Sequence, residues 1–268
     1  MRFASIGSGS EGNGTLLACG DTLILLDCGF SAKETVRRLR MKNVEPEQLT
    51  AILVTHEHAD HIKGVSVLSS RYSIPVYLTW GTFCCKPLQQ RPLIESLVTI
   101  ITPHEMFVIG DIEVQPVPVP HDAREPTQFV FSAAEWRIGV LTDVGSITSH
   151  ITDVYKNCDA LLLECNHDLE LLMNGPYPQS LKRRVAGDFG HLNNQQAALL
   201  LKSIYSERLQ HLVITHVSQK NNALDRVKSA LIGAVNCCPD WIQIAHQDTG
   251  FDWQALTCNE RILEEVSL

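Results

Sequence analysis

Four side chains that can bind metals lie within six residues of one another in the segment 55–61, THEHADH. They are His56, His58, Asp60 and His61. Imidazole and carboxylate ligands together suit zinc, manganese or iron. In a loop after a strand, His56 and His58 can point to one side, and the next two ligands can turn toward a second ion. One histidine alone would be better explained as a polar loop residue or a helix cap, but four ligand-type residues at this spacing favour a metal site.

Three further candidate ligands, His121, Asp143 and His216, lie far along the chain. Each follows a predicted β-strand, as His56 does. α/β folds place their chemistry where strand ends open into loops, so these residues can meet the histidine cluster. Asp143 could bridge two ions. Taken singly, the signals are weak, because Asp143 could be a turn residue and His216 a buried histidine satisfied by hydrogen bonds.

Short β-rich runs alternate with helical segments along the chain, which predicts an α/β fold. The strands are expected at 2–6, 15–19, 22–27, 51–55, 75–78, 128–132, 137–142, 160–164, 211–215 and 241–245, with broken strands in 98–119. The helices are expected from an N-cap at Ser31 to about Met41, from 61 to 72, near 179–186 and 193–206, and over 223–237, with a helical insertion or lid at 81–96. No linker splits the sequence, so we expect residues 1–268 to form one domain.

The composition is that of an ordinary globular protein, with a formal net charge of -8. This charge argues against a broad basic face for gripping duplex nucleic acid, although bound metal ions would add positive charge where phosphate sits. The nine cysteines include no C-x-x-C pair, which favours free thiols in a reducing compartment. The N-terminus carries no signal-peptide pattern, and no apolar run approaches the roughly 20 residues of a membrane helix. We therefore expect a cytoplasmic protein.

With these motifs, the sequence resembles the metallo-β-lactamase superfamily. The resemblance implies an αββα sandwich of two mixed sheets flanked by helices. It also implies two divalent metal ions: His56, His58 and His121 would bind the first, Asp60, His61 and His216 the second, and Asp143 would bridge them. A hydroxide that bridges the ions would be the nucleophile, and Asp60 would orient it. Zinc and manganese suit these ligands equally well.

A second pair of residues bears on the reaction. Glu164 ends the run ALLLE, and His191 precedes a predicted helix. In tRNase Z-type phosphodiesterases, a glutamate and a histidine at matching places act together, and the histidine protonates the departing oxygen. Such general acid catalysis contributes on the order of 10²–10⁴ in rate. The alternative is that His191 only caps the following helix.

Longer stretches resemble the YycJ/WalJ branch of the superfamily, also called VicX. The matching stretches are SGSEGNG at 8–14, HEHADHIKG at 56–64, HDAREP at 121–126, ECNHD at 164–168, GPYPQSLKRRVAGDFGHLNN at 175–194 and THVSQKNN at 215–222. Cys165 and Asn193 depart slightly from the pattern, which has Ala and Ser there. The resemblance implies a 5′-to-3′ exonuclease with DNA, rather than RNA, as its nucleic-acid substrate.

Eight residues are candidates for binding that substrate. The Gly-rich loop 8–14 could hold phosphate through its backbone N–H groups and hydroxyls, but it lacks the Gly-Lys-Ser/Thr of a Walker loop. The basic run 182–184 could hold a nucleic-acid backbone, or it could be a solvated helix face. The candidates are Ser8, Ser10, Asn13, Lys182, Arg183, Arg184, Asn221 and Asn222.

Two alternative functions remain open on the sequence. A hydrolase of the same fold could act on a small thioester, lactone or cyclic phosphodiester, which the acidic net charge favours. A non-catalytic regulatory protein could retain the fold, although no ligand is lost. An iron redox enzyme ranks lower, because such enzymes usually have glutamate where His58 stands. The sequence indicates neither the oligomeric state nor a role for His167.

Overall fold

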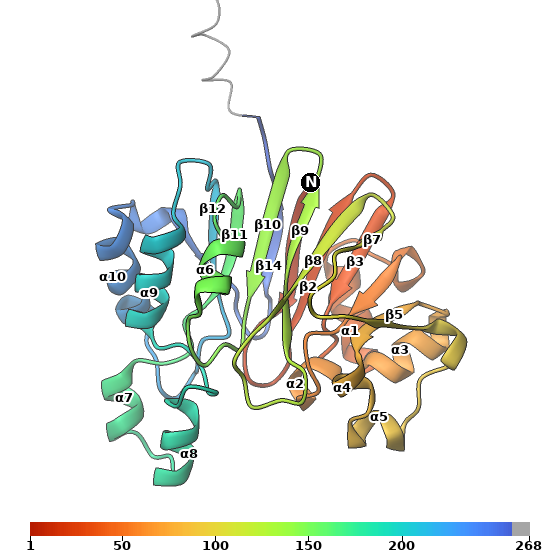
Figure 1. Cartoon of the computed structure of the whole chain (residues 1–268), viewed down its shortest axis with the longest axis horizontal. Helices are drawn as coiled ribbons and strands as arrows, with labels where there is room; N and C mark the ends of the chain where they lie inside the picture. Colours follow the sequence, from red (N-terminus) through yellow and green to blue (C-terminus); the bar gives the residue numbers. More distant parts are fainter. Residues whose placement is uncertain (259–268) are drawn as a thin grey trace, which may run out of the picture.

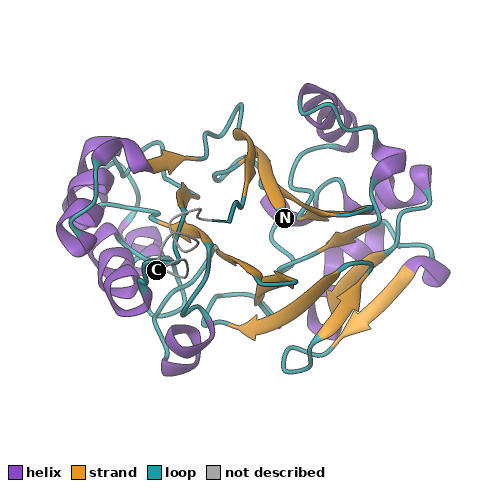
Figure 2. Ribbon diagram, turned by 90° about the horizontal axis from the view of Figure 1, so that it is seen from above, coloured by secondary structure: helices purple, strands orange, loops and turns teal. Residues whose placement is uncertain are grey.

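The computed structural model describes residues 1–258 and consists of two β-sheets packed face to face, with helices on both outer faces (Figures 1 and 2). This is the expected αββα sandwich of two mixed sheets. None of the described helices is both long and apolar enough to cross a membrane. The expectation that residues 1–268 form one domain stays a prediction, because residues 259–268 lie outside the described part.

Within the described residues, each sheet contains seven strands. The first contains, in spatial order, β14 (Phe251–Ala255), β1 (Arg2–Gly7), β2 (Gly14–Cys19), β3 (Thr22–Leu26), β4 (Ala51–Leu53), β5 (Val76–Thr79) and β6 (Val98–Ile101). The second contains β13 (Ile242–Ile244), β12 (His211–Thr215), β11 (Ala160–Glu164), β10 (Trp136–Leu141), β9 (Thr127–Ala133), β8 (Ile112–Pro118) and β7 (Phe107–Ile109). In both sheets an antiparallel half adjoins a parallel half, β3 to β6 in one and β10 to β13 in the other. Parallel strands end at the same edge, so the loops that follow them can meet there.

Helices cover both sheets. They are α1 (Ala32–Met41), α2 (Ala59–Ile62), α3 (Val65–Tyr72), α4 (Trp80–Phe83), α5 (Lys86–Gln90), α6 (Ser149–Val154), α7 (Leu169–Asn174), α8 (Gln179–Val185), α9 (Asn194–Ile204) and α10 (Leu224–Val235), with 3₁₀ turns η1 (Pro46–Gln48), η2 (Glu95–Leu97) and η3 (Pro239–Trp241). Helices α1, α3 and α5 pack outside the first sheet, and α6, α9 and α10 pack outside the second (Figure 1).

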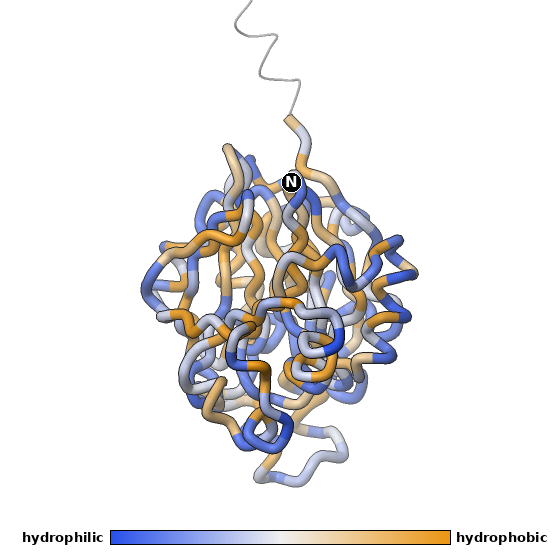
Figure 3. Tube along the Cα trace, turned by 90° about the vertical axis from the view of Figure 1, so that its right-hand side faces the viewer, coloured by the Kyte–Doolittle hydropathy of each residue, from blue (hydrophilic) through white to orange (hydrophobic). Residues whose placement is uncertain are grey.

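The core is layered. One apolar cluster lies between the sheets and includes Phe3, Phe129 and Phe131, and two more lie between each sheet and its helices. Full burial of a large apolar side chain stabilises a fold by about 1.5–3 kcal/mol. Figure 3 shows hydrophobic stretches along the central strands, whereas the outer helices alternate between hydrophobic and hydrophilic residues. The sandwich therefore forms a rigid frame beneath the loops at its edge.

Most expected elements are present, including the helical insertion at 81–96 and the Ser31 cap, whose side chain accepts from the Glu34 N–H. The single helix expected over 61–72 is wrong, because the chain forms α2 and α3 with a break at Gly64. The N–H of Gly64 donates to the carbonyl of Cys28 at 2.8 Å, and a Cβ at Gly64 would lie 2.6 Å from the Cys28 sulfur. This close approach diverts the chain between the two helices.

One strand and two α-helices were missed in the sequence. The run 241–245 was expected to form the last strand of the sheet. It forms β13, an edge strand of the second sheet, whereas β14 forms an edge of the first sheet by pairing with β1. Strand β14 is short, half-exposed and mixed in polarity, so it lacks an apolar run. Helices α6 and α7 have six residues each and depend on the caps Thr148 and Asp168, so they are too short to show helical periodicity.

Arg38 connects α1 to distant parts of the chain. Its guanidinium Nη1 donates to the carbonyls of Ile6 at 2.8 Å and Gln247 at 2.9 Å, and its Nε donates to Glu34 at 2.7 Å. The Gln247 side chain then bonds the backbone of the 8–14 loop, accepting from one N–H and donating to one carbonyl. Arg38 therefore fixes the base of this loop.

We predict that Arg38→Met lowers the free energy of unfolding by about 2–4 kcal/mol, because two buried carbonyls lose a charged donor. Urea unfolding measures the change. Arg37→Met is the matched control: Arg37 also pairs with Glu34 but is exposed, so its loss should have little effect. Equal losses in the two variants would contradict the role given to Arg38.

Candidate metal centre

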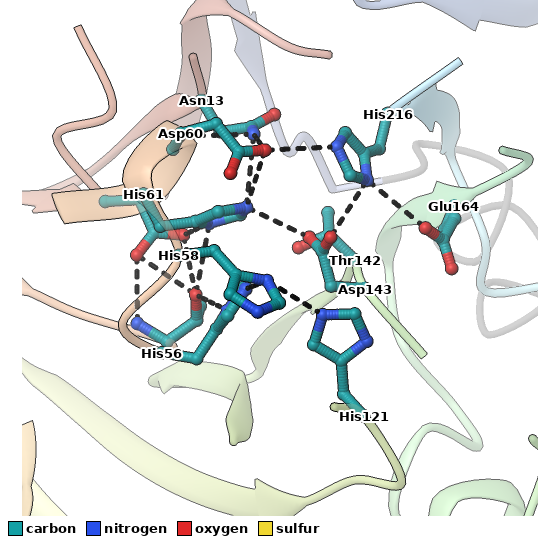
Figure 4. A network of polar contacts seen from close by, with 12 residues as sticks. Asn13, His56, His58, Asp60, His61, His121, Thr142, Asp143, Glu164 and His216 are labelled. Carbon is teal, nitrogen blue, oxygen red and sulfur yellow. Dashed lines mark hydrogen bonds and ion pairs between the residues drawn. The ribbon is translucent and has the colours of Figure 1, made fainter. Parts of the chain in front are cut away.

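The candidate ligands meet at one edge of the sandwich, where the loops after β4, β8, β10 and β12 converge (Figure 4). Two of them, Asp143 and His216, have left-handed backbone conformations with φ of 52°, and Asp27 has one with φ of 62°. Residues other than glycine rarely adopt this conformation, and such strain clusters at functional sites. All three residues follow strands of the frame, so the strain is localised where the chain turns into the shared edge.

One group consists of three imidazoles, those of His56, His58 and His121, with ring nitrogens within 4.8 Å of one another. His56 Nε2 lies 3.0 Å from His58 Nδ1, which lies 3.3 Å from His121 Nε2. Two ligand atoms at about 2.0–2.1 Å from one tetrahedral ion lie about 3.3 Å apart, so this spacing fits a single metal ion. His121 Nδ1 donates to the carbonyl of Gly190 at 2.9 Å, which leaves Nε2 free for a metal.

A second group consists of Asp60, His61 and His216, whose ligand atoms also lie within 4.8 Å of one another. The Nε2 atoms of both histidines lie 3.5 Å from Asp60 Oδ2. His61 Nδ1 lies 2.8 Å from Asp27 Oδ2. Metal-binding histidines commonly place a carboxylate on their other ring nitrogen, which fixes the tautomer and the orientation of the ring.

The carboxylate of Asp143 lies between the two groups and is 2% exposed. Its Oδ2 is 3.2 Å from His61 Nε2, and its Oδ1 is 3.1 Å from His216 Nδ1. Within the described residues, Asp143 Oδ2 and His216 Nε2 are buried without a partner in hydrogen-bond geometry. Because buried polar atoms are nearly always satisfied, two such atoms among oxygen and nitrogen donors fit a cation site.

The histidines of the site fall into two electrostatic classes. Burial lowers the pKa of His56 well below its ordinary value and also lowers the pKa of His121. Burial opposes charge on His61 and His216 too, but neighbouring carboxylates, Asp143 foremost, raise the pKa of both well above the ordinary value. His56 and His121 are therefore neutral near pH 7, whereas His61 and His216 hold protons that a cation would displace.

Glu164, the last residue of β11, is fully buried beside the ligands. Its Oε1 lies 2.7 Å from His191 Nδ1 and 3.2 Å from His216 Nδ1, while Oε2 accepts from the N–H groups of Val144 and Leu192, both at 3.1 Å. Burial alone would raise the pKa of Glu164, but the charge and hydrogen bond of His191 outweigh it and hold the pKa at about 2. Glu164 is therefore a fixed carboxylate that orients two imidazoles.

His191 lines a cavity of about 340 Å³ that also contains Asp60, Asp143 and His216. The N-cap of the following helix, α9, is Asn193, whose side chain accepts from the Gln196 N–H. Helix capping therefore does not explain His191.

The candidate substrate-binding residues divide between two places. Ser10, Arg184 and Asn221 line the cavity, where the Arg184 Nε pairs with Asp122 at its rim. Lys182 does not reach the cavity, because its ammonium is buried and donates to the carbonyl of Met173 at 2.7 Å.

The remaining four candidates do not line the cavity either. Ser8 is buried, donates to the Asn13 side chain at 3.2 Å, and accepts from the His216 N–H at 2.9 Å. The Asn13 amide lies 3.2 Å from the His61 ring, so both residues support ligands. The Asn222 amide exchanges hydrogen bonds with Asn194, both at 2.9 Å. Arg183 is exposed on α8.

Sequence reasoning missed several residues of the site. Asp27 and Thr55 contact the ligand imidazoles from behind, with the Thr55 hydroxyl 2.9 Å from His56 Nδ1. The signal for Asp27 was available, since it ends the strand expected at 22–27, and the observed strand β3 stops just before it, at Leu26. Asp122 and Tyr177 also line the cavity, and both lie in stretches already singled out by resemblance.

Comparisons with known proteins show the family to which this chain is similar. A family model described as the β-lactamase superfamily domain matches residues 22–217. The exodeoxyribonuclease YycJ of Bacillus anthracis is 34% identical over 229 residues, which cover 83% of this chain and 84% of the relative. The exodeoxyribonuclease WalJ of Streptococcus pneumoniae is 30% identical over 254 residues, which cover 93% of this chain and 90% of the relative.

Among solved structures, the short form of human tRNase Z superposes with a TM-score of 0.67 at 18% identity. The match covers 96% of this chain and 100% of the other, and it shows a shared fold. The resemblance in the motifs is thus confirmed over most of the chain: this protein belongs to the metallo-β-lactamase superfamily and, within it, to the YycJ/WalJ family.

Proposed function

We propose that this protein is a metal-dependent phosphodiesterase that degrades DNA from its 5′ end. The observation that carries the proposal is the pair of buried Glu164 and half-buried His191, 2.7 Å apart, beside seven converging candidate ligands. A hydrolase of activated esters has no need of such an acid. A phosphodiester needs one, because its departing alkoxide is a poor leaving group.

We assign His56, His58 and His121 to one divalent ion, and Asp60, His61 and His216 to a second, with Asp143 between them. Two such ions, zinc or manganese, would supply Lewis acidity and an activated water. The ligand atoms of each group lie within 4.8 Å of one another, and the donors suit both metals.

The chain's own residues would then hold the substrate and move protons. Asp60, at the cavity wall, would orient the attacking water and accept its proton. His191 would donate a proton to the departing oxygen, because its ring reaches the cavity while Nδ1 faces Glu164. Glu164 is a positioning residue, since it is fully buried and acts through His191.

The substrate class comes from the relatives that are named exodeoxyribonucleases and cover most of the chain. We propose DNA rather than RNA on that ground, with 5′-to-3′ polarity as the family resemblance implies. We place the protein in the cytoplasm, because all nine cysteines are free thiols. Within residues 1–258, no structural feature favours a small ester or a purely regulatory role over this function.

The first test compares leaving groups. We predict that the metal-loaded protein releases mononucleotides from 5′-labelled linear DNA, and that His191→Ala slows this cleavage by about 10²–10⁴-fold. Bis-p-nitrophenyl phosphate should be much less affected, because nitrophenolate departs without a proton. His150→Ala, an exposed histidine on α6, is the matched control and should change neither rate.

The metal content of each variant completes this test. Unchanged metal binding with a selective loss on DNA supports the acid role of His191. Loss of an ion would instead make His191 a ligand, and equal loss on both substrates would contradict the acid role. If the wild-type protein cleaves small esters but not DNA, the proposed function is wrong and the protein is a small-ester hydrolase.

The second test counts protons. Binding of a metal ion to His56, His58 and His121 should release no proton from His56 or His121, because burial holds their pKa values below the ordinary 6.5. Binding of a metal ion to Asp60, His61 and His216 should release protons from the two histidines, whose pKa values are raised. The affinity of this group for the ion should therefore fall as the pH drops below those pKa values. Calorimetric titration in two buffers of different ionisation enthalpy measures this. Equal proton release for both ions would contradict the assignment.

A further inference from the structure

One part of the cavity wall is apolar, although candidate metal ligands line the same cavity. It is formed by Tyr177, Leu181 and Val185, from the end of the α7–α8 loop and from α8. We call the segment 169–185 the α7–α8 arm, and Figure 1 shows α7 and α8 set apart from α6, α9 and α10. Leu181 and Val185 are four residues apart, so both lie on one face of α8.

The arm is held firmly in place. The ion pair between Arg184 and Asp122 connects α8 to the loop of the ligand His121. The Lys182 ammonium connects α8 to the end of α7. A Cβ at Gly175 would lie 2.7 Å from Asn221 Oδ1, so the arm packs tightly against the loop after β12.

Tyr177 lines the cavity, and its backbone is restricted. It lies between Pro176 and Pro178, and prolines on both sides restrict the backbone. The Lys220 ammonium lies 5.9 Å from the ring centroid, which adds a positive charge beside the aromatic face. A half-buried aromatic ring with a neighbouring cation, beside a phosphodiester site, is the arrangement on which nucleic-acid-binding proteins stack bases.

We infer that the α7–α8 arm forms a nucleobase subsite, in which Tyr177 stacks on the base and Leu181 and Val185 line its edge. The inference rests on the proposed function, because it assumes a nucleotide next to the scissile bond. The cavity that the subsite shares with the candidate metal centre has a volume of about 340 Å³, near the lower limit of small-ligand pockets, about 300 Å³, so the cavity takes one nucleotide of a single strand.

The geometry also identifies which nucleotide binds there. The backbone N–H of His191 donates to the backbone carbonyl of Val185 at 2.9 Å, so the apolar wall adjoins the residue proposed as the acid. In the proposed reaction the water oxygen bonds to phosphorus, the bond from phosphorus to the 3′ oxygen of the terminal nucleotide breaks, and His191 protonates that 3′ oxygen. The base on Tyr177 therefore belongs to the nucleotide that is released.

The test pairs a change in the protein with a change in the substrate. One oligodeoxynucleotide is intact, and the other has an abasic residue at the terminal position that is released first. Stacking of one base contributes about 1–3 kcal/mol, so Tyr177→Ala should lower kcat/KM on the intact strand by about 5- to 150-fold. The abasic strand should already be a poorer substrate of the wild type by a similar factor, and Tyr177→Ala should slow it no further.

Two control variants accompany the measurement. Tyr177→Phe keeps the ring and should retain cleavage of the intact strand. Tyr205→Ala removes a tyrosine that is 44% exposed at the far end of α9, and it should leave both rates unchanged.

Equal loss on both strands in Tyr177→Ala would overturn the inference, because the ring would then act only on the structure of the arm. A wild type that cleaves intact and abasic strands equally fast would overturn it as well, and this measurement needs no variant. Failure of the wild type to cleave any DNA while it cleaves bis-p-nitrophenyl phosphate would instead refute the proposed function.

Discussion

The buried carboxylate of Asp143 is the interaction on which the site depends. Burial alone would raise the pKa of Asp143, but His216 and His61 lower it well below the ordinary value. A buried charge is tolerated only when it is paired, and here the partners are imidazoles at 3.1 and 3.2 Å. Those imidazoles are themselves charged because Asp143 is present. Cations that displace their protons would preserve this balance, so folding, protonation and metal binding are coupled at one residue.

The sandwich makes this arrangement possible. Its parallel halves bring strand ends together, and the strained turns at Asp27, Asp143 and His216 lie at those ends. Buried side chains such as Thr55 then orient the ligand rings from behind. The ligands therefore depend on a rigid frame, which agrees with the general expectation that a precise site is supported by a second layer of contacts.

The sequence predicted the sandwich, and it singled out the seven candidate ligands that the structure brings to one edge, because strands with apolar runs and a dense histidine motif are local signals. It could not predict β14, whose pairing with β1 comes from opposite ends of the chain. Nor could it separate Lys182 from Arg184, two residues apart in one basic run, because only packing determines that one faces α7 and the other the cavity. The apolar wall of the arm could not be predicted for the same reason, because only the fold places its side chains in one cavity with the candidate metal ligands.

We propose that the seven candidate ligands hold two divalent ions. Anomalous diffraction from crystals of metal-loaded protein, collected on either side of the absorption edge of the bound metal, locates these ions. We expect two peaks, one about 2.0–2.2 Å from the ring nitrogens of His56, His58 and His121, and one at that distance from Asp60, His61 and His216. Asp143 should contact both. A single peak, or a peak bound by His191 in place of His216, would contradict this proposal.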